Sequence, residues 1–254
     1  MSSHSGRLAE VLIEDRVFSR VVIGDNPFLG FSYYSQARNA LYERKFSDAA
    51  RIEEVISGAL AAGARGMLTS IQCRPRRDLV LAALERACES CGIRIPTIAV
   101  LGADFEGEAK SLARANAQVG LLHGQLTDAL FRKRTGDFPP EFDDLLARIR
   151  AMGLVPGVST HNAGEVVPAL AGHDVAVVNT PVNKIGWRMC PSPEHALAAL
   201  AATERQVIAM KPLAMGRIAP KEGMEYVLGR PEVDMVVVGL ASADEAAETI
   251  GVAG

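Results

Sequence analysis

The sequence predicts an α/β fold, a single (β/α)8 barrel that spans residues 1–254. Short runs of β-branched residues alternate with stretches of helical spacing along the whole chain, which indicates repeated strand and helix units. Several runs carry no polar alternation, as is typical of parallel strands covered on both faces. A length of 254 residues suits eight such units in one domain.

Eight strands and eight helices are expected in alternation. The strand candidates are residues 20–24, 66–70, 93–100, 118–123, 154–159, 175–179, 207–211 and 235–239. The helix candidates are residues 48–62, 76–91, 107–116, 140–152, 163–171, 193–203, 221–229 and 242–250. Residues 7–20 form an extra element, which we expect to cover the N-terminal mouth of the barrel.

Composition excludes several classes of function. The chain carries 27 Lys and Arg against 30 Asp and Glu, so no general field favours nucleic acid or an anionic membrane. No apolar run is long enough to span a bilayer, and the first residues lack the apolar core of a signal peptide, so a cytoplasmic location is the default expectation. Cys88 and Cys91 form a lone C-x-x-C pair, read either as a zinc or redox site or as two small residues on a helix.

Polar residues follow most of the expected strands. In a (β/α)8 barrel the active site lies at the C-terminal ends of the strands, so these positions are candidates for binding a small substrate. Capping of strand ends and helix starts is the alternative explanation for each residue taken separately. The candidates at these ends are Asp25, Asn26, Ser159, His161, Asn179 and Asn183.

His123 and Lys211 are the strongest candidates for chemistry. His123 closes an apolar strand, and an imidazole there can donate or accept a proton near pH 7. Lys211 ends a strand before Pro212 and is expected to stabilise a substrate oxyanion, or to form a Schiff base if its pKa is lowered. A satisfied buried histidine and a lysine that reaches solvent are the structural alternatives. His123, His161 and Asp25 lack a firm additional ligand, so no metal is expected.

Two further segments carry ligand hypotheses. Residues 25–47 are long for a strand-to-helix loop and are rich in aromatic residues, among them Tyr33 and Tyr34, which indicates a pocket wall or an oligomer contact. Gly239 and Ser242 join the last strand to the last helix, where many barrels bind phosphate. Ser242 and Glu245 also form a capping box, which needs no ligand.

The C-terminal hundred residues resemble the aldo-keto reductases. Four segments agree in order and spacing, namely residues 157–162 (GVSTHN), 178–183 (VNTPVN), 208–216 (IAMKPLAMG) and 236–242 (VVVGLAS). The resemblance implies a barrel fold and an Asp, Tyr, Lys and His tetrad that protonates a carbonyl while NADPH delivers hydride. It also implies that Ser159, Thr160 and Asn179 occupy the positions that contact the nicotinamide.

The chain departs from this family at the tetrad. Only the histidine carries over, as His123, because the aspartate position falls on Leu68, the tyrosine position falls near Cys73, and residues 96–101 contain no lysine. No Lys or Arg follows Arg230, so the last helix offers no partner to a 2′-phosphate. NADPH is therefore left open as a cofactor and none is favoured.

These observations favour lyase or isomerase chemistry on a small polar carbonyl compound or polyol. His123 is expected to act as acid and base, with Lys211 and Asp25 also catalytic. The expected substrate contacts are Asn26, Tyr33, Tyr34, Ser159, His161, Asn179 and Asn183, with Gly239 and Ser242 as phosphate contacts. One alternative is a divergent NAD(P)H-dependent reductase whose displaced acid is Tyr33, Tyr34 or Lys211, and the other is a non-catalytic ligand-binding barrel. A homo-oligomer is left open.

Overall fold

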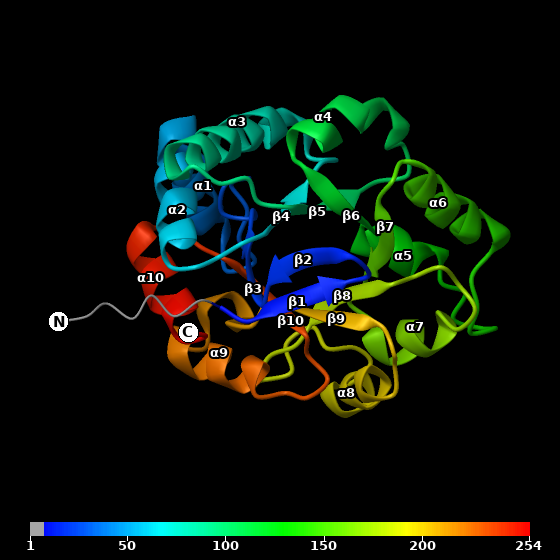
Figure 1. Cartoon of the computed structure of the whole chain (residues 1–254). Coiled ribbons are helices and arrows are strands. Elements are labelled where there is room, and N and C mark those ends of the chain that lie inside the picture. Colours follow the sequence, from blue (N-terminus) through cyan, green and yellow to red (C-terminus); the bar gives the residue numbers. More distant parts are fainter. Residues whose placement is uncertain (1–7) are drawn as a thin grey trace.

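The computed structural model describes residues 8–254, apart from the side chain of Arg74, and forms a closed barrel of eight parallel strands (Figure 1). The strands are β3 (Val21–Gly24), β4 (Met67–Ser70), β5 (Thr97–Leu101), β6 (Ala117–Leu122), β7 (Val155–Ser159), β8 (Val177–Pro181), β9 (Gln206–Met210) and β10 (Met235–Gly239). They pair in chain order, and β10 closes the barrel by pairing with β3. The predicted (β/α)8 barrel is therefore confirmed.

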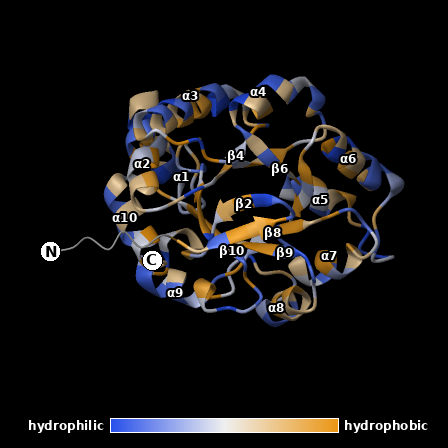
Figure 2. Cartoon of the chain, in the orientation of Figure 1, coloured by the Kyte–Doolittle hydropathy of each residue, from blue (hydrophilic) through white to orange (hydrophobic). Residues whose placement is uncertain are grey.

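The strands are apolar on both faces because each face is covered. On β3, Val22 packs in the cluster inside the barrel, whereas Val21 and Ile23 pack in the cluster between the strands and the helices. Figure 2 shows apolar residues concentrated on the central strands and mixed hydropathy on the surrounding helices. This pattern explains why the sequence runs lack polar alternation.

A two-stranded hairpin closes the N-terminal end of the barrel. It consists of the antiparallel strands β1 (Glu10–Ile13) and β2 (Arg16–Ser19). Ile13 and Phe18 are fully buried and pack with the residues inside the barrel. The extra element expected at residues 7–20 thus covers this mouth, although residue 7, like the rest of 1–7, lies outside the described residues.

Ten α-helices surround the barrel in the described part of the chain. They are α1 (Gln36–Lys45), α2 (Ala49–Ala61), α3 (Arg74–Cys91), α4 (Ala109–Arg114), α5 (Gly124–Leu130), α6 (Pro140–Ala151), α7 (Ala163–Ala169), α8 (Pro193–Ala201), α9 (Pro220–Leu228) and α10 (Ala243–Gly251), with short 310 helices at Glu106–Glu108 and Ala214–Gly216. The eight predicted helices agree with α2 to α4 and α6 to α10 within a few residues.

The structure corrects the sequence prediction in three places. α1 lies within the segment 25–47 that was expected to be a loop, and it buries none of its residues, so it has no apolar periodicity to detect. α5 was not predicted, because its seven residues are too few to show a helical period. β5 begins at Thr97 rather than at residue 93, because the Ile93 N–H still bonds to the Cys88 carbonyl at the end of α3 and Pro96 has no N–H to donate.

Candidate active site

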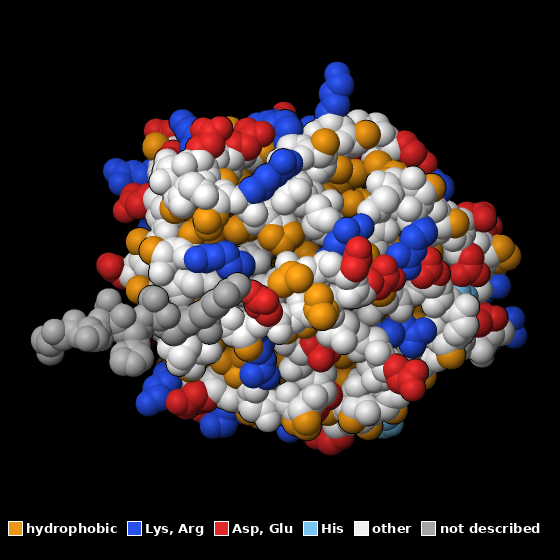
Figure 3. Space-filling model, viewed as in Figure 1, with side chains coloured by type: hydrophobic (Ala, Val, Ile, Leu, Met, Phe, Trp, Pro, Cys, Tyr) orange, Lys and Arg blue, Asp and Glu red, His pale blue; other side chains and the backbone are white. Residues whose placement is uncertain are grey.

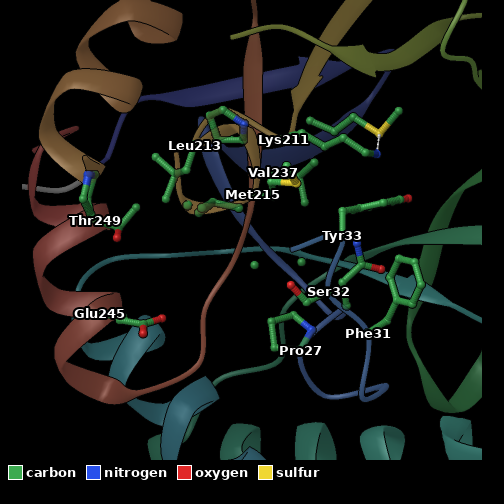
Figure 4. A pocket seen from close by; sticks show the side chains of 18 of the residues that line it. Pro27, Phe31, Ser32, Tyr33, Lys211, Leu213, Met215, Val237, Glu245 and Thr249 are labelled. Carbon is green, nitrogen blue, oxygen red and sulfur yellow. Dashed lines mark hydrogen bonds between the residues drawn. The ribbon is translucent and has the colours of Figure 1, made fainter. Parts of the chain in front are cut away.

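A pocket of about 480 Å³ lies at the C-terminal ends of β3, β9 and β10 (Figure 4). Its wall also includes the segment after β3, the segment after β9 and one face of α10. Its volume falls in the range of small-molecule sites, and its place in the barrel is that of an active site. Six residues predicted from the sequence line it, namely Asp25, Asn26, Tyr33, Asn179, Lys211 and Gly239.

Lys211 brings an amine without a carboxylate partner into this pocket. Its backbone follows β9 with a φ of 60°, a conformation that residues other than glycine adopt only rarely. Its Nζ lies 3.0 Å from the Sδ of Met210 and 4.9 Å from the ring centroid of Tyr33. Figure 4 shows Lys211 and Tyr33 on the same side of the pocket. Burial and the nearby Arg188 lower the pKa of Lys211 to about 7. The amine therefore exchanges a proton near neutral pH.

Asn179 offers an unused acceptor in the same wall. Its side chain is 3% exposed, and its Nδ2 donates to Ser159 Oγ at 3.0 Å and lies 3.6 Å from Met210 Sδ. Its Oδ1 is buried and has no hydrogen-bond partner. A buried acceptor left without a donor costs about 1–3 kcal/mol. A ligand N–H that reaches this oxygen would remove that cost.

Asp25 is the buried acid of the pocket. Its side chain is buried, and its Oδ2 accepts a hydrogen bond of 2.6 Å from the Ser70 N–H, which joins the end of β3 to the end of β4. Burial raises the pKa of Asp25 to about 6, although the hydrogen bonds from Ser70 and Thr69 act in the opposite direction. The carboxyl group therefore holds its proton to higher pH than an exposed aspartate does.

His123 lies beside the pocket at the start of α5. Its Nδ1 accepts the Gln125 N–H at 3.3 Å, so the neutral ring carries its proton on Nε2. Burial, followed by the neighbouring His161 and Lys211, lowers the pKa of His123. At neutral pH this histidine is therefore uncharged and can donate a hydrogen bond from Nε2.

The loop after β8 adds Trp187 and Arg188, which sequence reasoning missed. The Arg188 Cζ lies 4.9 Å from the ring centroid of Tyr33, and its Nη1 lies 3.4 Å from His161 Nε2. Asn183 holds this loop, because its Oδ1 accepts the Trp187 N–H at 2.8 Å and its Nδ2 donates to the Trp187 carbonyl at 2.9 Å. The chain's only tryptophan just after a strand end was the available sequence signal.

Five other predicted residues do not line this pocket, and one of them, His161, lies beside Arg188 and Asp128. Ser159 hydrogen-bonds to Asn179, and both ends of the Asn183 amide are used within its loop. Tyr34 is 54% exposed and lies under the Arg38 guanidinium. Ser242 caps α10 by accepting the Glu245 N–H.

The expected capping box differs in one bond. The Glu245 carboxylate was expected to reach the Ser242 N–H, whereas it accepts the Ala241 N–H at 2.8 Å. Among the lining residues at this end are Arg38, Glu245 and Glu248. Figure 4 shows Glu245 across the pocket from Lys211. This end of the pocket is therefore largely acidic.

The described residues give no sign of a metal site or a membrane span. Within residues 8–254, no group of three or more His, Cys, Asp and Glu side chains is arranged to hold a metal ion, and Cys88 and Cys91 are free thiols. None of the described helices combines the length and the apolar character needed to cross a membrane. Figure 3 shows acidic and basic side chains interspersed over the face in view.

Comparison with known proteins identifies the fold through structure alone. Neither a protein-family model nor a curated protein matches the sequence. A solved structure assigned as an aldo-keto reductase from Pseudomonas aeruginosa is similar, with a TM-score of 0.70 and 17% identity over 100% of this chain and 98% of that chain.

Two other solved structures agree with this result. An aldo-keto reductase from Bacillus halodurans in its holo form has a TM-score of 0.64 and 14% identity over 97% of this chain and 91% of its own. A thermostable aldo-keto reductase in complex with the inhibitor epalrestat has a TM-score of 0.63 and 13% identity over 96% and 94%. The resemblance found in the sequence thus extends over the whole barrel: the chain has the fold of the aldo-keto reductases.

Proposed function

We propose that the chain is an NADH-dependent oxidoreductase that interconverts a small carbonyl compound and its alcohol, with Lys211 as the proton donor and acceptor. The observation that carries this proposal is the Lys211 amine in the pocket, which has no carboxylate partner among the described residues and lies near Asn179, whose buried Oδ1 is unpaired. Both Asn179 Nδ2 and Lys211 Nζ lie near the same Met210 sulfur. The fold shared with aldo-keto reductases supports the same reaction class.

The residues of the pocket fit a nicotinamide dinucleotide. Asn179 Oδ1 is an acceptor for a carboxamide N–H, and Ser159 Oγ lies next to it. Gly24 and Gly239 are paired at the ends of β3 and β10 and both line the pocket, where a side chain on either would press against Val237 or Pro27. Arg38, at the far end, supplies a positive charge for the phosphates.

The acidic end of the pocket favours NADH over NADPH. Glu245 and Glu248 of α10 line this end, and a carboxylate there can accept a hydrogen bond from a ribose hydroxyl. The same carboxylates would repel a 2′-phosphate, and no basic residue follows Arg230 in the chain. We therefore expect the cofactor to lack that phosphate.

In the mechanism that we propose, Lys211 moves the proton. Asn179 and Arg38 would hold a reduced nicotinamide dinucleotide, which would supply the hydride for the carbonyl carbon. The Lys211 ammonium then gives its proton to the carbonyl oxygen and is left as a neutral amine, and in the oxidative direction the neutral amine takes the proton from the hydroxyl group. Neutral His123 can orient the same oxygen through the N–H on Nε2, since its Nδ1 is held by the Gln125 N–H.

The lyase or isomerase chemistry expected from the sequence has less support than this alternative. The lyase or isomerase hypothesis was based mainly on the loss of three of the four tetrad residues. If Lys211 takes the place of the missing acid, that loss no longer argues against a reductase. The solved structures with this fold that are cited above are all reductases. A non-catalytic barrel would have no use for an amine with a lowered pKa in its pocket.

Titration with NADH and NADPH tests the proposal directly. Trp187 is the only tryptophan and lines the pocket, so its fluorescence reports binding at this site. We expect NADH to quench it with a micromolar Kd, about −8 kcal/mol, and NADPH to bind at least about tenfold more weakly. The absence of quenching by either nucleotide at about 1 mM would overturn the proposed function.

A pair of charge reversals on α10 sharpens the test. Glu248→Lys places a cation on the pocket wall and should move the preference toward NADPH by about tenfold or more. Asp244→Lys makes the same charge change on the same helix at a residue that does not line the pocket. If both variants shift the preference equally, the effect comes from the general field of the helix and not from contact.

A further inference from the structure

Two cations lie over the ring of Tyr33 at the mouth of the barrel, and two histidines lie near them. Lys211 Nζ and Arg188 Cζ each lie 4.9 Å from its centroid, and His161 lies 3.4 Å from Arg188. His123 is close enough to feel the charges of His161 and Lys211. The cluster comes from four different segments of the chain, which only the closed barrel brings together.

The acidic groups near this cluster contact other residues rather than its two cations, Arg188 and protonated Lys211. Asp128 of α5 accepts hydrogen bonds from the Thr160 hydroxyl and the His161 N–H. Asp25 accepts from Ser70. Among the described residues, neither Arg188 nor Lys211 forms an ion pair with a carboxylate. Asp128 Oδ2 also lies 3.7 Å from His161 Nδ1. Within the described part of the chain, Arg188 and protonated Lys211 are therefore left to meet the charge of an anionic ligand.

Both cations are held in an uncommon backbone conformation. The φ angles of Arg188 and Lys211 are 58° and 60°, in the left-handed region, which costs on the order of 1 kcal/mol for a residue with a side chain. Asn183 fixes the loop of Arg188 with two hydrogen bonds to Trp187, and the guanidinium lies over the rings of Tyr33 and Trp187. The orientation of the Arg188 guanidinium is thus set before any ligand binds.

From this cluster we propose that the substrate carries a carboxylate, which Arg188 binds while Lys211 meets the reacting carbonyl. The inference rests on the proposed oxidoreductase function and names its substrate class, a short oxo acid or the matching hydroxy acid. A planar guanidinium fork matches the two oxygens of a carboxylate. Arg188 and Lys211 lie over the same Tyr33 ring, each 4.9 Å from its centroid, so one short acid can contact both. Its carboxylate would pair with a guanidinium that has no carboxylate partner among the described residues.

Binding of oxamate, an unreactive analogue of a 2-oxo acid, tests the carboxylate site without turnover. Isothermal calorimetry should detect binding to the wild-type protein, and Arg188→Leu should weaken it about 10- to 100-fold, since a charge-assisted bidentate contact is lost. Arg188→Lys keeps the charge without the fork and should fall between the two. Equal binding of oxamate by wild type and Arg188→Leu would overturn the inference.

A matched control separates contact from the general field. Lys184 lies four residues earlier in the same loop, is exposed and pairs with Glu222, so Lys184→Met removes one positive charge nearby without touching the cluster. Oxamate binding by this variant should stay within about twofold of wild type. A loss as large as that of Arg188→Leu would mean that any positive charge on this loop suffices, which contradicts a specific site.

Turnover separates failure of this inference from failure of the proposed function. With NADH as reductant, kcat/KM should be higher for pyruvate and succinic semialdehyde than for their methyl esters, and the ratio of acid to ester should fall toward one in Arg188→Leu. Faster reduction of the esters, or of glyceraldehyde 3-phosphate, would leave the oxidoreductase standing and overturn the carboxylate assignment. If oxamate bound but neither nucleotide did, the carboxylate-binding site would be supported and the proposed oxidoreductase function would be overturned.

Discussion

The two ends of the barrel are built from the same strands but differ in polarity. At the N-terminal end, Ile13 and Phe18 of the hairpin fill the interior with fully buried apolar side chains. At the C-terminal end, the interior holds Lys211 without a carboxylate partner, Asn179 with an unpaired oxygen and Asp25 with a raised pKa. One end gains free energy from burial, whereas the other leaves polar groups unsatisfied until a ligand binds.

This difference predicts that variants of the two ends have separable effects. Variants of the N-terminal end should lower stability and leave the chemistry of the folded molecules intact. Variants of the C-terminal end should lower turnover and leave stability unchanged or raised, since they remove groups that burial disfavours.

Lys211→Met should give the largest effect. The variant removes the proposed proton donor, and general acid catalysis contributes about 10²- to 10⁴-fold, so NADH-dependent turnover should fall by that factor. Its unfolding free energy should stay unchanged or rise, because methionine fills similar space without an amine that lacks a carboxylate partner. Steady-state kinetics and urea unfolding measure the two quantities, and a large loss of stability would make Lys211 a structural residue.

The pH dependence of the wild-type protein should follow the pKa of Lys211, about 7. Reduction of the carbonyl needs the ammonium, so its rate should fall as the pH rises through 7, while alcohol oxidation needs the amine and should become faster. Treatment with an oxo acid and borohydride should leave Lys211 unmodified. A stable adduct on Lys211 would favour Schiff-base chemistry over proton transfer.

Phe18→Ala should lower the unfolding free energy by about 3–5 kcal/mol, since it leaves a cavity among the fully buried side chains at the N-terminal end. Val17→Ala, in the same strand but with a side chain that is 48% exposed, is the matched control and should change the free energy by less than about 0.5 kcal/mol. Urea unfolding measures both. If Phe18→Ala lost less than about 1 kcal/mol, the hairpin would not be part of the core.

Asp25→Asn should reveal a smaller, pH-dependent effect. Because the pKa of Asp25 is raised from 3.8 to about 6 in the folded state, folding favours its protonated form, and this contribution to stability is lost as the pH rises from about 4 to 6. Asparagine keeps an acceptor for the Ser70 N–H but does not ionise. The stability of the variant relative to wild type should therefore increase by about 3 kcal/mol between pH 4 and pH 7.

Urea unfolding at both pH values measures this difference, and the other carboxylates cancel in the comparison. If the difference in unfolding free energy between the two proteins were the same at both pH values, Asp25 would already be ionised at pH 4. In that case, the Ser70 hydrogen bond would outweigh the effect of burial on this carboxyl group.

Much of the barrel could be predicted because its signals are local. The run Met235–Gly239 was predicted with its observed bounds, since a strand buried on both faces has only apolar side chains to show. α1 escaped prediction because none of its residues is fully buried, and partly buried residues such as Tyr42 contact the core without an apolar period to detect. Asp25, Asn179 and Lys211 were predicted from their positions at strand ends and Tyr33 from the aromatic-rich segment 25–47, and the structure brings them to one pocket.

The contacts that give those residues their chemistry could not be predicted from the sequence. The amine of Lys211 was first assigned an electrostatic role because a lowered pKa depends on burial and on Arg188, which comes from another strand-to-helix loop. The hydrogen bond from Ser70 to Asp25 spans 45 residues of sequence. The Glu245 carboxylate accepts a hydrogen bond from the Ala241 N–H and not from the Ser242 N–H. A capping pattern in the sequence does not distinguish these two adjacent donors.

The sequence by itself determined the alternation of strands and helices, the apolar faces and the polar residues after the strands, because each depends on neighbours close in the chain. Tertiary structure alone decided that Arg188, Lys211 and His161 share one mouth, that Asn179 keeps an unpaired oxygen and that α10 presents carboxylates to the pocket. Charge, burial and hydrogen-bond satisfaction depend on distances between segments far apart in sequence, and closing the barrel sets those distances.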